Sequence, residues 1–509
     1  MVVRYLRGSA PAIVCLFSAQ AAYAELTAQD VWSDWRDYLG SSGYEVSASE
    51  QMLGDTLTIS DMTLSLAVPE EDMIISIVIP SMGLRENSDG TVSGQLPSPL
   101  PIRFAVAEPG DEAEVQGELV LTHTGTVMMI SGSPDNMTYK HSSDQMEMAI
   151  GNVVVEGDLI PESLYRGRIT MTDWAGTTTM VNGDLRDFDQ NYSVGSMTYD
   201  IAFDDPGSED RGEFQGTLQQ VAVSGTGRIP NDMDPSDMSS MLKSGFAVDG
   251  KISFESGNST VQGTGDGESF SATSSSQGGS LAVSMDASNL SYDVGGKGLA
   301  VSVTTDALPF PVSFELAETL FKLAVPVAKS DEEQNFAFGL TLGDFVMSDM
   351  IWSLFDPGGT LPRDPATIAI DVNGKAKVFV DLMDPESAGA LAGYGARPGE
   401  LNALSLNNLL VSAVGARLSG AGDFTFDNTD LETFDGFPRP IGAIELQLDG
   451  ANTLIDSLIT MGIVRNEDAM GARMMMGMLA VPGDGPDSLK SRVEMNEQGH
   501  ILANGQRIQ

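Results

Sequence analysis

The sequence has 509 residues and carries 27 Lys and Arg against 72 Asp and Glu, a formal net charge of −45. A chain this acidic cannot neutralise phosphate groups, so nucleic acid is excluded as a partner. One cysteine, Cys15, and three widely spaced histidines argue against disulfides, Cys-ligated zinc, histidine metal sites and Ser-His-Asp catalysis.

The first 24 residues have the pattern of a secretory signal peptide. Arg4 and Arg7 form a short basic region, an apolar stretch follows, and Ala22-Tyr23-Ala24 matches an A-x-A cleavage site. The apolar run is shorter than the roughly 20 residues that a membrane-spanning helix needs. We therefore expect cleavage after Ala24, a cysteine-free mature chain without a transmembrane segment, and location in the periplasm.

A short helix is predicted at the start of the mature chain. Thr27 and Asp30 have the spacing of a capping box, and Gly40 marks the end of the helix. Apolar residues recur between them at helical spacing: Val31, Trp32, Trp35, Tyr38 and Leu39.

After this helix the apolar residues recur with a period of two, which indicates β-strands. Leu57 and Ile59 alternate in one phase and Met62 and Leu64 in the opposite phase, so a bulge or turn is expected at Ser60-Asp61. With 55 glycines in the chain, we expect mostly antiparallel sheet made of short strands, each apolar on one side.

Pairs of a polar residue and glycine predict the turns between strands. The clearest is Asn373-Gly374, which separates the alternating segments 368–372 and 376–380 and favours a type I′ hairpin. Asp449-Gly450 is interpreted in the same way. Further turns are expected at Asp89-Gly90, Asn182-Gly183, Asp249-Gly250, Asp266-Gly267 and Asn504-Gly505.

Few further helices are predicted. The expected helices run from Asp234-Pro235 to about Lys243, from Ser348 to Phe355, from Asp384-Pro385 to about Ala392, and through an αα-hairpin at 451–480. The fold class is therefore mainly β (α+β), with long antiparallel, curved sheets, a few short helices and a C-terminal αα-hairpin. We divide the chain into the signal peptide 1–24, an N-terminal β-rich half 25–230 and a C-terminal β-rich half 231–509.

Motifs that carry catalysis are scarce. Ser240-Met241-Leu242-Lys243 matches S-x-x-K but lacks the companion motifs of penicillin-recognising enzymes, so a short surface helix is the simpler interpretation. Three acidic clusters, at 184–189, 232–237 and 423–435, do not fit the EF-hand spacing. We assign no catalytic, cofactor-binding or metal-binding residue, and expect no cofactor.

The helical hairpin offers one candidate binding site. Its second helix is rich in methionine, a flexible side chain that adapts to varied apolar ligands. The candidate contacts for an apolar ligand are Leu458, Met474, Met475 and Met478. The alternative is that the hairpin packs over one end of the sheet and that its methionines belong to the core.

Several longer segments resemble one family of exported alphaproteobacterial proteins, catalogued as domain of unknown function 2125. The resemblance extends over the mature chain and rests on the segments 31–35, 43–46, 361–367, 381–385, 399–407, 422–428, 472–475 and 503–507. It implies an exported protein but no activity and no catalytic residues. By looser analogy, the architecture is similar to that of envelope proteins that hold lipids in a curved β-sheet groove.

Three functions stay open from the sequence. The first is an exported, non-enzymatic envelope protein that binds a lipid or another apolar ligand in a sheet groove. The second is a periplasmic hydrolase that acts on a glycan through a pair of carboxylates. The third is a structural or adhesive β protein.

Overall fold

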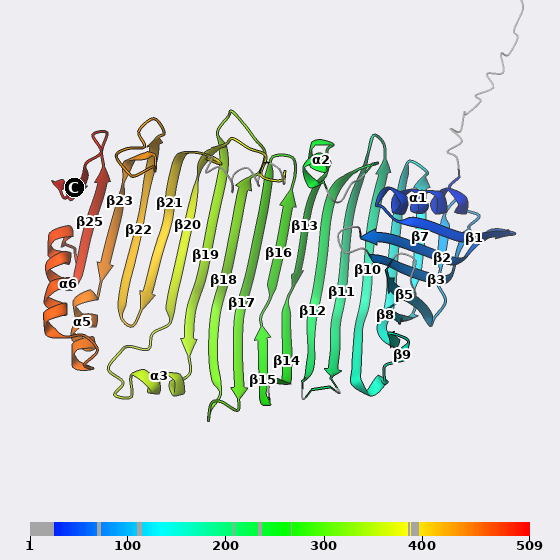
Figure 1. The fold of residues 1–509 in the computed structure, drawn as a ribbon, viewed down its shortest axis with the longest axis horizontal. Coiled ribbons are helices and arrows are strands. Elements are labelled where there is room, and N and C mark those ends of the chain that lie inside the picture. Colours follow the sequence, from blue (N-terminus) through cyan, green and yellow to red (C-terminus); the bar gives the residue numbers. More distant parts are fainter. Residues whose placement is uncertain are drawn as a thin grey trace, which may run out of the picture.

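The computed structural model describes residues 25–68, 73–108, 114–205, 207–208, 210–232, 237–265, 267–384, 387 and 397–509. The described chain forms an extended antiparallel sheet with short helices along its margins (Figure 1). The predicted fold class, mainly β with curved antiparallel sheet, is confirmed. The predicted signal peptide lies outside the described residues.

The strands follow one another along the sheet in chain order. In the N-terminal part they are β1 (Glu45–Leu53), β2 (Thr56–Val68), β3 (Met73–Glu86), β4 (Val92–Gln95), β5 (Leu100–Ala107), β6 (Val115–Thr124), β7 (Val127–Ser133), β8 (Asn136–Val155) and β9 (Asp158–Leu159). The central strands are β10 (Tyr165–Asn182), β11 (Leu185–Asp204), β12 (Arg211–Pro230), β13 (Ala247–Phe254), β14 (Ser256–Gly265), β15 (Glu268–Ser276), β16 (Gly279–Met285), β17 (Asn289–Thr305), β18 (Val312–Pro326) and β19 (Gln334–Met347). The C-terminal strands are β20 (Ala366–Val378), β21 (Gly399–Ala413), β22 (Ala416–Asp427), β23 (Arg439–Asp449), β24 (Val481–Pro482), β25 (Ser488–Met495), β26 (Ile501–Ala503) and β27 (Gln506–Arg507).

The helices lie at the ends and edges of this sheet (Figure 1). They are α1 (Ala28–Ser41), α2 (Met238–Lys243), α3 (Asp349–Phe355), α5 (Ala451–Thr460), α6 (Asn466–Leu479) and the 3₁₀ turn η1 (Glu162–Leu164). None of the helices in the described ranges is long and apolar enough to cross a membrane.

The sheet is a meander in which consecutive long strands pair. β12 pairs with both β13 and β14 in one register, and β17 pairs in the same way with β15 and β16. β13 and β14 are therefore two halves of one long strand that is interrupted near its middle, and so are β15 and β16. β12 thus joins strands on both sides of the predicted division at residue 230.

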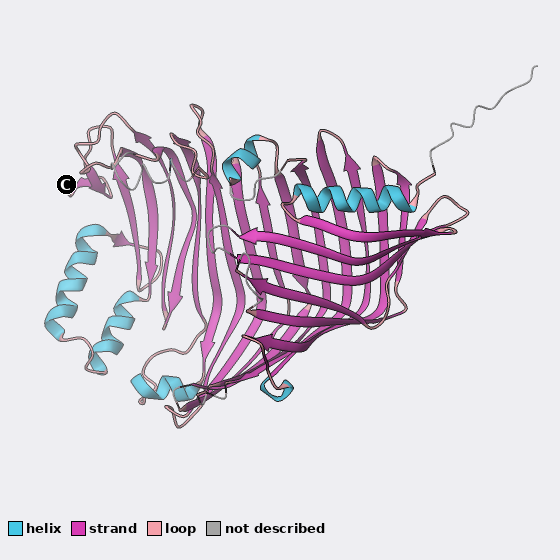
Figure 2. Ribbon diagram, turned by 45° about the vertical axis from the view of Figure 1, so that its right-hand side comes forward, coloured by secondary structure: helices cyan, strands magenta, loops and turns pink. Residues whose placement is uncertain are grey.

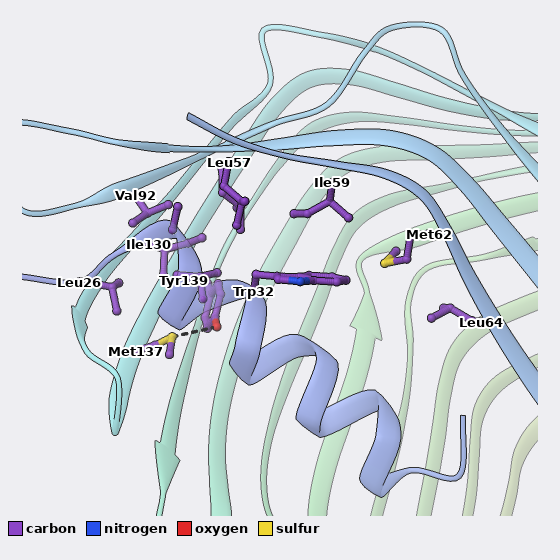
Figure 3. Packing of buried hydrophobic residues seen from close by; sticks show 13 residues of the cluster. Leu26, Trp32, Leu57, Ile59, Met62, Leu64, Val92, Ile130, Met137 and Tyr139 are labelled. Carbon is purple, nitrogen blue, oxygen red and sulfur yellow. Dashed lines mark hydrogen bonds between the residues drawn. The ribbon is translucent and has the colours of Figure 1, made fainter. Parts of the chain in front are cut away.

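The N-terminal strands turn in front of the central strands and enclose α1 (Figure 2). As predicted, α1 begins with a capping box between Thr27 and Asp30. Trp32 of α1 is only 1 % exposed and packs among Leu57, Ile59 and Ile130 (Figure 3). This closed core exists because the sheet passes both behind and in front of the helix.

A line of irregular residues crosses the sheet where the long strands change direction. Residues with a positive φ interrupt one strand after another, namely Asp61 in β2, Asp173 in β10, Gln220 in β12, Gly298 in β17 and Asp344 in β19. In β11 the apolar alternation changes phase between Val194 and Met197, where its pairing with β12 passes over Gly195 and Gln220. Such kinks bend a sheet. The irregularity predicted at Ser60-Asp61 is confirmed and is the first of this series.

Several predicted turns are wrong, because the glycines lie inside strands. Asn373-Gly374 falls within β20, and Asp249-Gly250 falls within β13. A side chain at Gly374 would meet the Phe336 ring of the neighbouring strand at 2.5 Å, so glycine is needed there for packing and not for a turn. Asp449-Gly450 ends β23 and leads into α5 instead of a hairpin. Asp89-Gly90, Asn182-Gly183 and Asn504-Gly505 do form turns; Asp266 lies outside the described residues.

Two further expectations are tested by the element bounds. The strands are not short: β8, β11 and β12 have 20 residues each, because each continues through a bend where the sequence suggests an end. The predicted helices at 348–355 and in the hairpin 451–480 are present as α3, α5 and α6. α2 covers the later part of the helix predicted from Asp234-Pro235 to about Lys243. Asp234-Pro235 and most of the expected helix 384–392 lie outside the described residues.

Candidate functional site

The face of the sheet that contacts α1 continues beyond the helix as an open apolar surface, which we call the inner face. It is defined by one row of residues that lie directly opposite one another on successive strands. From β8 to β25 the row is His141, Gly176, Tyr192, Val223, Ile252, Leu281, Val294, Phe321, Leu340, Ile370, Leu409, Gly420, Leu446 and Ser491. The row is apolar over most of its length.

The apolar side chains of the inner face stay accessible to solvent in the central strands. Ile252, Leu281, Val294 and Phe321 are 38–41 % exposed, although each lies in a long paired strand. The same holds for Tyr292, Leu342, Ile368 and Val411. A contiguous patch of exposed apolar side chains is unusual on a protein surface and is typical of interaction sites, which makes the inner face the candidate functional site.

The opposite face of the same strands is polar. The row next to the inner row runs through Ser224, Lys251, Ala282, Asp293, Lys322, Gly339 and Asp371. Successive side chains of a strand point to opposite faces, so this row is directed away from the inner face. The sheet is therefore amphipathic, with charges on one side and hydrocarbon on the other.

Aromatic rings make the surface smooth by lying over glycines of the neighbouring strand. A side chain at Gly176 would meet the Tyr192 ring at 2.0 Å, and one at Gly279 would meet Phe254 at 2.6 Å. This pairing explains many of the glycines that occur within strands. It produces broad, flat apolar areas instead of narrow pockets.

Beyond the bend, a second group of exposed apolar side chains surrounds a hollow of about 440 Å³. Its lining includes Ile201, Phe203, Phe214, Val261 and Phe270. A neighbouring hollow of about 840 Å³ has a mixed lining at the same ends of the strands. There Arg166 forms ion pairs with Asp200 and Glu213, both at 2.7 Å.

The N-terminal end of the inner face is closed by a buried polar cluster. Arg186 of β11 donates to the Asp34 carboxylate of α1 at 2.6 Å, and Asn182 of β10 donates to it at 2.7 Å. The Trp35 indole donates to the Tyr139 hydroxyl at 3.2 Å. Burial and the nearby Asp34 charge raise the pKa of Tyr139, so it stays neutral. These contacts fix α1 on the sheet.

A row of aromatic rings connects this cluster to the open surface. The ring centroids of Tyr139 and His141 are 6.3 Å apart, those of His141 and Trp174 5.5 Å, and those of Trp174 and Tyr192 5.7 Å. Burial lowers the pKa of His141, so its imidazole is neutral at neutral pH and fits the apolar surface.

The predicted ligand contacts of the helical hairpin lie elsewhere. Met474, Met475 and Met478 of α6 are 60–68 % exposed, whereas Leu458 of α5 is partly buried. The hairpin stands beside the C-terminal strands (Figure 1). The three methionines are therefore available for a ligand but do not form part of the inner row. The sequence does not predict the inner row. The alternation within each strand is apparent from the sequence, but the residues that lie opposite one another depend on the pairing register between strands.

The S-x-x-K match does not form a catalytic pair. Lys243 contacts Ser239 at 2.8 Å and Asp381 at 2.9 Å. The Asp237 carboxylate caps α2 by accepting a hydrogen bond from the backbone N–H of Ser240. The hydrogen bond to Asp381 raises the pKa of Lys243, so the amine stays protonated and cannot act as a base. The residues described contain no cluster of three or more His, Cys, Asp or Glu side chains placed to hold a metal ion.

Comparison with known proteins finds one family match, which covers just under half of the chain. Residues 248–497 match the family model described as "Uncharacterized protein conserved in bacteria (DUF2125)". No curated protein and no solved structure matches the chain. The match begins in β13 and ends just after β25, so the motifs at 31–35, 43–46 and 503–507 lie outside it. The predicted resemblance to this family is confirmed by the match over residues 248–497.

Proposed function

We propose that the protein is an exported, non-enzymatic component of the bacterial envelope that binds the acyl chains of lipids on its inner face. The observation that carries this proposal is the row from Ile252 to Leu409, which is apolar, continuous and accessible. An acyl chain laid on the row would remove this surface from water, at roughly 25 cal/mol for each Å² of apolar area buried.

The glycan hydrolase receives less support. Glycoside hydrolysis needs a carboxylic acid with a raised pKa beside a second carboxylate. Where their surroundings shift the pKa of carboxyl groups in the described residues, they lower it, as Arg166 does for Asp200. The lowered pKa values favour surface ion pairs over an acid catalyst.

Cross-linking tests the binding proposal on adjacent positions. A photo-reactive phenylalanine analogue replaces Leu281 on the inner face or Ala282 on the opposite face of β16. After purification from the periplasm and irradiation, mass spectrometry should find lipid attached at position 281 and none at 282. Equal labelling, or labelling at neither position, would contradict the proposal.

Export is tested separately, because it rests on the signal-peptide pattern at 1–24. Mass-spectrometric sequencing of the protein from a periplasmic fraction should give Glu25 as the first residue. A membrane-bound form that retains Met1 would contradict export by cleavage after Ala24.

A further inference from the structure

We propose that the inner face holds several acyl lipids at once, arranged along the sheet, and passes them from strand to strand. This inference rests on the proposed function but goes beyond it, because a carrier could bind one lipid in one place. It follows from the length, the continuity and the flatness of the inner face.

The length of the inner face exceeds that of one lipid. Neighbouring strands lie 4.7–4.9 Å apart, so the inner row extends roughly 60 Å from β8 to β25. The hydrocarbon core of a bilayer is about 30 Å thick and holds two layers of acyl chains, so one chain spans about 15 Å. The row is thus about four acyl chains long.

No polar barrier divides this length. In the described strands β16–β23, the residues registered with the inner row include no Asp, Glu, Lys or Arg. Charged residues of the same strands, such as Asp293 and Lys322, occupy the opposite face. A bound chain would therefore meet hydrocarbon at each step along the sheet.

Aromatic rings that lie over glycines of the neighbouring strand make the inner face flat. Phe336 lies over Gly374 and Phe254 over Gly279, so rings fill the space that ridges between strands would otherwise leave. Because each position along the row offers similar apolar contacts, the binding energy changes little as a chain moves. At the N-terminal end α1 closes the row through the Asp34–Arg186 pair, which leaves the C-terminal part as the open direction.

Stoichiometry is the first test. Delipidated full-length mature protein is incubated with phosphatidylethanolamine vesicles, re-isolated and measured by native mass spectrometry. We expect two or more lipids per chain at saturation. Saturation at one lipid would overturn the inference but leave the proposed function intact, whereas no bound lipid would overturn both.

Movement is tested with a charged block in the middle of the row. Val294 and Phe321 lie opposite each other, so Val294→Asp with Phe321→Lys places an ion pair across the inner face. The matched control exchanges the neighbouring charges on the opposite face, Asp293→Lys with Lys322→Asp. Transfer of fluorescent phosphatidylethanolamine between donor and acceptor vesicles should fall at least tenfold in the block and stay within twofold in the control.

Circular dichroism first establishes that both variants are folded. A folded block variant that transfers lipid at the wild-type rate would overturn movement along the row. If the block variant does not fold, cross-linking decides the matter in the wild-type background: the photo-reactive residue, placed singly at Ile252 and at Leu409, should capture lipid from both positions. Capture at only one of them would contradict a shared row.

Discussion

Apolar side chains are buried at the N-terminal end of the sheet and exposed in its central strands. Around α1 the sheet turns back on itself, and Trp32, Leu57 and Ile59 are almost completely buried. In the central strands the same alternation of apolar residues leads to Val294 and Phe321, which stay about two-fifths exposed. The amphipathic pattern is shared, so what separates a buried core from an exposed apolar surface here is whether a second layer covers it.

Removing Trp32 should have the largest effect on stability. Trp32→Ala opens a cavity in the closed core, which we expect to cost about 3–5 kcal/mol of unfolding free energy. Urea unfolding followed by circular dichroism measures the change. A loss below about 1 kcal/mol would mean that the N-terminal part is as open as the central strands.

Trp352 tests a second small core at the edge of the sheet. It is 8 % exposed, its ring centroid lies 5.0 Å from that of Phe355, and the Arg363 guanidinium carbon stands 5.7 Å from the ring centre. We expect Trp352→Ala to cost about 3 kcal/mol, at the lower end of the range for buried tryptophan. An unchanged melting temperature would make Trp352 part of a binding surface instead.

Phe321 should behave differently because it is on the open surface. Phe321→Ser should cost about 1 kcal/mol or less in the lipid-free protein, since little packing is lost beyond the edge contact with Phe338 at 6.1 Å. In the lipid-bound protein the same substitution should reduce the stabilisation that lipid provides. Thermal melts with and without phosphatidylethanolamine compare the two, and equal losses in both states would argue against a ligand at this position.

The smallest effect is expected on α6. Met475 and Met478 are 60 % and 65 % exposed, so Met475→Gln with Met478→Gln should change stability by less than about 0.5 kcal/mol for each substitution. Lipid recovered with the protein, measured by native mass spectrometry, should decrease if these side chains contact it. Unfolding of the double variant would show that they are core residues, and unchanged lipid content would remove the hairpin from the ligand contacts.

The sequence predicts local structure better than it predicts this surface. The capping box of α1 and the helical hairpin are encoded within a few residues, and both are present. Asn373-Gly374 has the local pattern of a turn, whereas the actual role of Gly374 depends on Phe336, a residue 38 positions away in another strand. The phase change at Ser60-Asp61 was visible, but its repetition at Asp173, Gln220 and Asp344 acquires meaning only when the strands are aligned.

The meander has a consequence for how the molecule forms. Each long strand pairs with the strands that precede and follow it in the chain. Most contacts therefore join strands that are neighbours in the sequence, as in repeat proteins. The buried apolar cluster around α1 is complete once β8 has been added, and Asn182 of β10 and Arg186 of β11 then pair with Asp34. Folding can therefore proceed from the N-terminus, with one strand after another added to the growing edge of the sheet.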